Sequence, residues 1–98
     1  MRLKIPRDQF EMCPIVGYLV GGLGADIVYE VSDDFVRDLQ IERSFGNQTN
    51  YTTYLIRLIF KADRSNIALL SRIYPAECLT IWAYQNVIDF NKQLFSLD

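Results

Sequence analysis

Histidine is absent from this chain of 98 residues. The commonest metal ligand and general base is therefore missing, and Ser and Thr have no histidine to activate them. Only two cysteines occur, Cys13 and Cys78, which lie far apart in apolar surroundings. That spacing predicts small buried thiols, since neither a disulfide nor a zinc site finds further support. We expect no enzyme activity, no cofactor and no metal.

Long apolar runs are also missing. The most apolar stretch, 14–31, is interrupted by four glycines and two acidic residues. It therefore falls short of the roughly 18 uninterrupted apolar residues expected of a membrane-spanning helix. The basic first residues are soon followed by acids and lack a convincing cleavage site for a signal peptide. We expect an intracellular protein that does not associate with a membrane.

The chain has no excess of basic charge. Its net charge is −2 and its pI is near 5.0, so the electrostatic signature of nucleic-acid binding is lacking, and we expect no direct contact with nucleic acid. The charges are nevertheless segregated along the sequence. Residues 26–42 carry a net charge of −5, whereas the remainder carries +3.

Apolar residues, by contrast, are plentiful, because they make up 50% of the chain and include six Phe, six Tyr and one Trp. A single domain, 1–98, buries only about two thirds of the surface of its unfolded chain. The apolar surplus predicts an interface with a second copy or with another protein, and we expect a homodimer. The alternative is that the surplus forms ordinary exposed surface.

The first half of the chain gives mixed secondary-structure signals. Alternating basic and apolar residues over 1–6 predict a short extended segment or edge strand. Residues 27–31 suit either a helix capped by Asp26 or a short strand, and the pattern does not separate the two. Ser32, followed by two acids, predicts the start of a helix that ends within 44–46.

The segment 51–62, capped by Thr49 or Asn50, is predicted to be a helix. A strand is the competing interpretation of 51–60, because β-forming residues are frequent there. If 51–62 is a helix, its apolar residues at helical spacing form the buried face, and its basic side chains lie on the opposite face. The predicted face consists of Tyr54, Leu55, Leu58, Ile59 and Ala62.

The second half of the chain reads as three further helices. Asp63 or Ser65 caps the first of them, and Pro75 both ends it and opens the next. Leu79, Trp82 and Ala83 are predicted to form the inner face of that next helix, and the spacing over 87–95 favours a terminal helix, with a docked tail as the alternative. The fold class is therefore mainly α: a single compact helical bundle of about four to five helices, with a short N-terminal extended segment.

A motif joins these helices: Ala62-Asp63, Asn66, Leu70 and Tyr74-Pro75, at fixed spacing. Physically, it combines an N-terminal cap, two core-facing residues four apart and a proline stop. The pattern A-D-x-x-N-x-x-x-L-x-x-x-[FY]-P resembles a motif of small uncharacterised proteins encoded by phages and prophages. The resemblance implies an origin in a phage or mobile element and brings no activity with it.

Three glycines, Gly21, Gly22 and Gly24, are the first place to look for a phosphate-binding loop. The Walker A motif requires Lys and Ser or Thr after its last glycine, and the dinucleotide-binding pattern requires a glycine where Ile27 stands. Neither pattern is met. Gly17 and Gly21, four apart, favour close packing between helices instead.

Acidic residues at 30, 34 and 38 recur every fourth position, so a continuous helix would place Glu30, Asp34 and Asp38 on one face. Such a face suits a hard cation or a basic partner protein. The plainer alternative is a solvated helix surface.

Basic residues at four- and three-residue spacing, Arg57, Lys61 and Arg64, form the second candidate site. They suit an acidic partner or a small anionic ligand, and the alternative is again a solvated surface. We therefore expect a non-enzymatic phage or mobile-element protein in the cytoplasm of the host cell that docks on a host or phage protein. Inhibition of a host defence complex is one specific form. The alternatives are a protein that sequesters a nucleotide or other small anionic ligand and a structural or assembly component of the virion.

Overall fold

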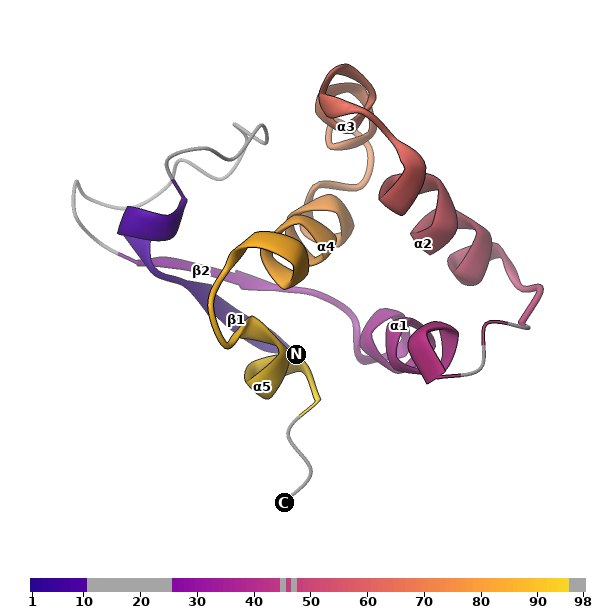
Figure 1. Ribbon diagram of the computed structural model, residues 1–98, viewed down its shortest axis with the longest axis horizontal. Helices are drawn as coiled ribbons and strands as arrows, with labels where there is room; N and C mark the ends of the chain where they lie inside the picture. The colour runs from indigo at the N-terminus through magenta and orange to yellow at the C-terminus, as the bar shows by residue number, and fades with distance from the viewer. Residues whose placement is uncertain (11–25, 45, 47, 96–98) are drawn as a thin grey trace.

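The computed structural model describes residues 1–10, 26–44, 46 and 48–95. Over these residues the chain forms a small helical bundle with a two-stranded sheet at its N-terminal end, so the predicted fold class is confirmed (Figure 1). The elements in chain order are β1 (Arg2–Ile5), the 3-10 helix η1 (Arg7–Gln9), β2 (Ile27–Glu30), α1 (Asp33–Ser44), α2 (Tyr51–Lys61), α3 (Arg64–Leu70), α4 (Pro75–Asn86) and α5 (Phe90–Leu94). The predicted close packing between helices through Gly17 and Gly21, the glycine patch and Cys13 lie outside the described residues.

The two strands pair in antiparallel register, with Leu3 opposite Tyr29 and Ile5 opposite Ile27. These four side chains are buried and the alternate ones are exposed, as expected for a sheet with one covered face. Of the two structures predicted for 27–31, helix or strand, the strand forms, over Ile27–Glu30. The residues of β2 form a strand because their period of two matches that of β1, a partner more than 20 residues earlier.

The side-chain amide of Gln93 covers part of the free edge of β1. The backbone N–H of Lys4 donates to Gln93 Oε1 (3.0 Å), and Gln93 Nε2 donates to the carbonyl oxygen of Lys4 (2.9 Å). An amide side chain thus takes the place that a third strand would occupy. This contact ties α5 to the sheet and satisfies edge groups that would otherwise invite another strand.

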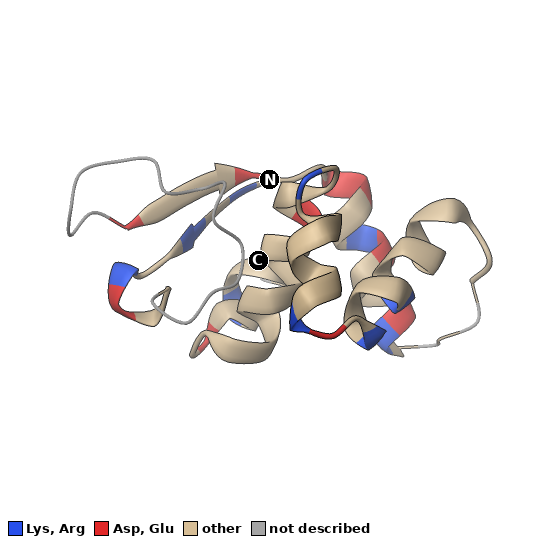
Figure 2. Ribbon diagram, turned by 90° about the horizontal axis from the view of Figure 1, so that it is seen from above, with Lys and Arg blue, Asp and Glu red and all other residues tan. Residues whose placement is uncertain are grey.

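The core lies between the sheet and the helices, with α4 at its centre. Cys78, Leu79, Thr80, Ile81 and Ala83 are all buried, so α4 is covered on most sides. It carries a single charged residue, Glu77, whereas red acidic segments gather on α1 (Figure 2). The inner face predicted for α4 is confirmed for Leu79 and Ala83. Trp82 is half-buried, edge-on to Phe10.

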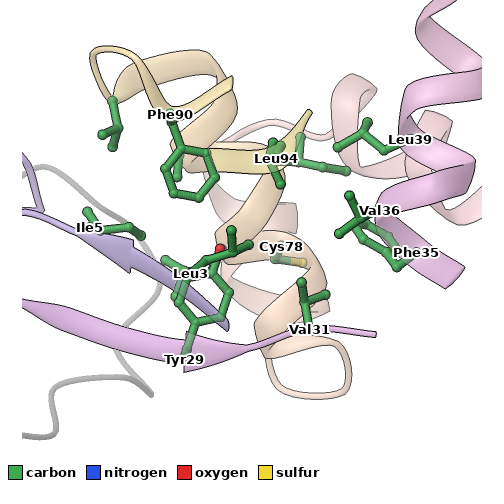
Figure 3. Close-up of a cluster of buried hydrophobic side chains, with 14 of the residues drawn as sticks. Leu3, Ile5, Tyr29, Val31, Phe35, Val36, Leu39, Cys78, Phe90 and Leu94 are labelled. Atoms are coloured by element: carbon green, nitrogen blue, oxygen red, sulfur yellow. The ribbon is translucent and has the colours of Figure 1, made fainter. Parts of the chain in front are cut away.

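Side chains from both strands and from α1, α4 and α5 converge in this core (Figure 3). Phe90, on α5, is fully buried, and Leu94 lies one turn further along. A polar link in this region is a 2.8 Å hydrogen bond between the hydroxyls of Tyr29 and Thr80. Burial and the nearby charge of Glu77 raise the pKa of the Cys78 thiol to about 11, so this thiol stays protonated and inert at neutral pH.

The helix starts follow the local signals in the sequence. Ser32 Oγ accepts from the N–H of Phe35 (3.1 Å), Asn50 Oδ1 from the N–H of Thr53 (2.8 Å) and Asp63 Oδ1 from the N–H of Asn66 (2.8 Å). Each contact satisfies a backbone donor that the first helical turn leaves free. Pro75 occupies the first position of α4. After α1, Gly46 adopts φ of 70°, which glycine tolerates best.

The buried face of α2 differs from the predicted one. Leu55 and Ile59 are buried as expected, but Tyr54 and Leu58 are more than half exposed, and Thr53 and Ile56 are buried instead. The helix carries apolar residues on nearly every side, so spacing alone does not select the face that packs. Arg57, next to the buried Ile56, pairs with Glu42 of α1.

Thr53 offers a test of the packing of α2. Its side chain is fully buried, and its hydroxyl has no hydrogen-bond partner among the described residues. Thr53→Val keeps the branched shape and removes the unsatisfied hydroxyl, so we expect the free energy of unfolding to rise by about 1 kcal/mol in urea denaturation. The matched change at half-buried Thr52 should have little effect. A loss of stability in Thr53→Val would contradict the packing.

Candidate functional site

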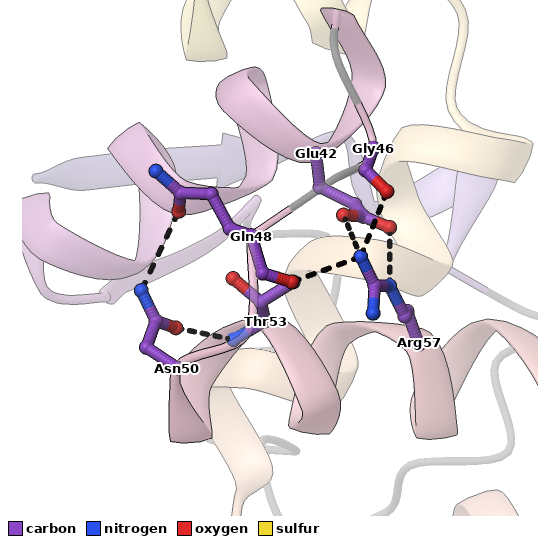
Figure 4. Close-up of polar contacts among 6 residues, drawn as sticks. All are labelled: Glu42, Gly46, Gln48, Asn50, Thr53 and Arg57. Carbon is purple, nitrogen blue, oxygen red and sulfur yellow. Dashed lines mark hydrogen bonds and ion pairs between the residues drawn. The ribbon is translucent and has the colours of Figure 1, made fainter.

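Arg57 is the most highly connected polar residue of the described chain, and it joins three segments (Figure 4). Its Nε donates to Glu42 Oε2 (2.7 Å) and its Nη2 to Glu42 Oε1 (2.9 Å). The same Nη2 donates to the carbonyl oxygens of Gly46 (2.9 Å) and Gln48 (3.0 Å). The guanidinium thus holds the end of α1, the following loop and α2 together.

Arg57 and Glu42 form a stable ion pair. Hydrogen bonding from Arg57, with a smaller contribution from its charge, lowers the pKa of Glu42 below its ordinary value. The same hydrogen bond raises the pKa of Arg57. Both side chains are largely covered, with 15% of Glu42 and 31% of Arg57 exposed. Arg57 contacts the loop after α1. The sequence pattern, a stripe of basic residues, did not predict these contacts.

The predicted acidic residues lie on two different elements. Glu30 belongs to β2, opposite Arg2 in the sheet, so the continuous helix that would align it with Asp34 and Asp38 does not form. Asp38 is 5% exposed and lies 3.6 Å from Arg37 Nε, and the carboxylate of Asp34 lies 3.4 Å from Nη1 of the same arginine. Among the described residues no group of three or more Cys, Asp or Glu side chains is placed to hold a metal ion.

An apolar hollow lies between α2 and α3. It has a volume of about 500 Å³ and is lined by Leu58, Ala62, Leu69, Leu70 and Ile73, together with two polar residues, Lys61 and Asn66. A second hollow of about 180 Å³ adjoins it along α2, lined by Tyr51, Tyr54, Leu55, Leu58, Leu70 and Tyr74. Leu58 and Leu70 line both hollows, so the two form one continuous surface.

We call this surface, centred on Tyr51, Tyr54, Leu58, Leu69 and Ile73, the α2–α3 surface. These five are among eight large apolar side chains that are exposed in the described residues, with exposed fractions between 52% and 73%. The other three are Met1, Val28 and Ile88, which lie in other parts of the chain. α3 contributes no buried residue, although Ile67 and Leu70 pack against the rim of the core. A contiguous apolar area of this kind marks a binding surface more often than isolated exposed residues do.

One end of the α2–α3 surface is closed by two tyrosines. The hydroxyls of Tyr51 and Tyr74 are hydrogen-bonded to each other, which links the first turn of α2 to the residue before α4. This contact, with the charge of Glu77 contributing, raises the pKa of Tyr74. Glu77 therefore lies close to the tyrosine end of the surface.

Of the predicted basic residues, Lys61 lines the larger hollow and Arg64 begins α3, whereas Arg57 is turned to the α1–α2 loop. Blue segments accordingly flank the connection between α2 and α3 in Figure 2. The sequence did not identify the apolar surface beside them. The side chain of Ile73 is 73% exposed. The available signal was that apolar residues surround both α2 and α3 on more sides than a single core can cover.

A search against protein-family models, curated proteins and solved structures finds no match to this chain. The resemblance of the 62–75 motif to phage proteins therefore stays a prediction. Within the described residues no helix is long and apolar enough to cross a membrane.

Proposed function

We propose that this chain is a small non-enzymatic binding protein that docks onto another protein through the α2–α3 surface. The observation that carries the proposal is the gathering of five large exposed apolar side chains around two adjoining hollows. In a chain of this size such an area is costly to leave in water, and covering it provides the driving force for association.

The sequence motif bears on the nature of the partner. The motif at 62–75 supports an origin in a phage or mobile element, with a host or phage protein as partner and a host defence complex as one specific target. The sequence also predicts a homodimer, in which a second copy of the chain would bury an apolar surface. Sequestration of a small anionic ligand has less support, because Arg57 directs its hydrogen bonds to Glu42 and to loop carbonyls.

The proposal is tested by capturing proteins from host-cell lysate with tagged variants. Leu69→Ser combined with Ile73→Ser makes the α2–α3 surface polar, and we expect it to lose at least one protein that the unaltered chain retains. Ile88→Ser is the matched control, since Ile88 is 76% exposed on a different part of the chain. All three positions are exposed, so stability should change by no more than about 0.5 kcal/mol. Identical sets of captured proteins for every variant would contradict the proposal.

A further inference from the structure

The shape of the α2–α3 surface fits a helix. α2 has 11 residues and is therefore about 16 Å long. The next two residues, Ala62 and Asp63, are extended, with ψ of 137° and 178°, so the chain leaves α2 before it begins α3. The larger hollow lies in the space between these two helices. A third helix laid along it would pack its side chains between theirs, as helices do in bundles and in groove-type recognition.

The chemistry of the lining specifies the face that such a helix must present. Leu58, Leu69 and Ile73 supply exposed apolar side chains from both sides of the hollow. An amphipathic helix with apolar residues at positions i, i+3, i+4 and i+7 offers a matching stripe. The polar groups at the hollow, Lys61 and Asn66, are near one end of α2, so the partner's polar contacts should gather there.

The charge around the hollow favours an acidic partner. Residues 58–73 contain three basic side chains, Lys61, Arg64 and Arg72, against one acid, Asp63, so they carry +2 while the rest of the chain carries −4. The carboxylate of Asp63 is occupied as the cap of α3. The acid Glu77 follows Tyr74 by three residues, and the Tyr74 hydroxyl bonds that of Tyr51, at the opposite end of α2 from Lys61. Lys61 is therefore the basic side chain that lines the larger hollow, and Arg64 follows it at the start of α3.

A second copy of the described chain offers a poor fit. Its acidic helix, α1, already buries its apolar residues Phe35, Val36 and Leu39 in its own core. The exposed apolar residues outside the α2–α3 surface are single side chains on separate elements, so they do not form a stripe. Two copies meeting through the same surface would also place hollow against hollow.

We propose that the α2–α3 surface binds an amphipathic helix of a different protein, with acidic side chains of that helix placed at the Lys61 end. This inference rests on the proposed docking function and adds the structural class and charge of the partner. The apolar stripe provides most of the affinity, and the acidic residues set orientation and specificity.

The test uses designed helical peptides of about 14 residues, roughly four turns, that share one leucine stripe. One peptide has glutamates on its polar face and its matched control has lysines. In fluorescence anisotropy we expect the glutamate peptide to bind about tenfold more tightly, because a few exposed charge pairs are gained. Its affinity should fall with added salt. Lys61→Glu should abolish or reverse the preference, and Ile73→Ser should weaken both peptides.

Equal binding of the two peptides, or tighter binding of the lysine peptide, would overturn the acidic-helix inference and leave apolar docking intact. The inference is also overturned if neither peptide binds, or if sedimentation shows a dimer that Leu69→Ser with Ile73→Ser dissociates. The proposed function fails by a different result, namely unaltered capture of lysate proteins by that same double variant.

Discussion

Replacing Phe90 with alanine is expected to lower the free energy of unfolding by about 3–5 kcal/mol. The phenyl ring is fully buried and lies where α5 meets the sheet and the central helix (Figure 3). Its removal loses the transfer free energy of the ring and leaves a cavity that α5, only five residues long, cannot refill without detaching from β1. Because a domain of this kind has a total stability on the order of 5–15 kcal/mol, this single change removes a large part of it.

Urea denaturation followed by circular dichroism measures the effect. Phe90→Leu provides a milder step for the case in which the alanine variant does not fold, and its loss should be smaller. The neighbouring change Ile88→Ala should cost less than about 0.5 kcal/mol, since Ile88 is 76% exposed. If Phe90→Ala cost no more than Ile88→Ala, the core would not be organised as described.

Arg57→Ala is expected to give the largest loss of thermal stability among changes at charged residues. Exposed ion pairs usually contribute little, but this one is bidentate and largely covered, and the same guanidinium also holds two loop carbonyls. Without it, the carboxylate of Glu42 loses its partner and the loop loses its attachment to α2. Arg57→Lys keeps the charge and not the planar fork, so it should recover only part of the stability.

Thermal unfolding of Lys61→Ala is the control, since Lys61 is an exposed basic residue of the same helix. Amide hydrogen exchange of residues 48–50 should accelerate in Arg57→Ala and not in Lys61→Ala. Equal melting temperatures for the two alanine variants would show that the Arg57 contacts do not stabilise the fold.

The same pair predicts a dependence on pH. The pKa of Glu42 is lower in the folded chain than its ordinary value, so the stabilisation from its charged form is complete above the ordinary carboxyl pKa of about 4.3. The stabilisation declines as the pH falls below that value and is gone below the lowered folded pKa. The stability difference between the unaltered chain and Glu42→Gln should therefore be greatest at neutral pH and shrink on acidification. A difference that is constant with pH would contradict the ion pair.

The parts of the fold that were predicted from the sequence depend on neighbouring residues. The caps at Ser32, Asn50 and Asp63 and the proline at the start of α4 act within one helical turn, so the local pattern contains them. The sequence did not distinguish a strand from a helix at β2, because the strand forms only by pairing with a distant segment.

The candidate site was harder to predict because it depends on which helix faces are left uncovered. Lys61 was identified by its spacing and lines the hollow, but Tyr54 and Leu58 were assigned to the core. Both are exposed because α2 packs through Leu55, Ile56 and Ile59, while Arg57 pairs with Glu42 of α1 across 15 residues. The spacing of apolar residues within one helix does not predict a contact over this distance in the sequence.

Docking through the α2–α3 surface is tested most directly by placing a photo-crosslinking amino acid at position 69 and, in a matched protein, at position 88. Both side chains are exposed, and they lie on different parts of the fold. In host-cell lysate we expect position 69 to crosslink to a discrete partner protein and position 88 to crosslink to none. Crosslinks from position 88 alone, or the same products from both positions, would contradict docking through this surface.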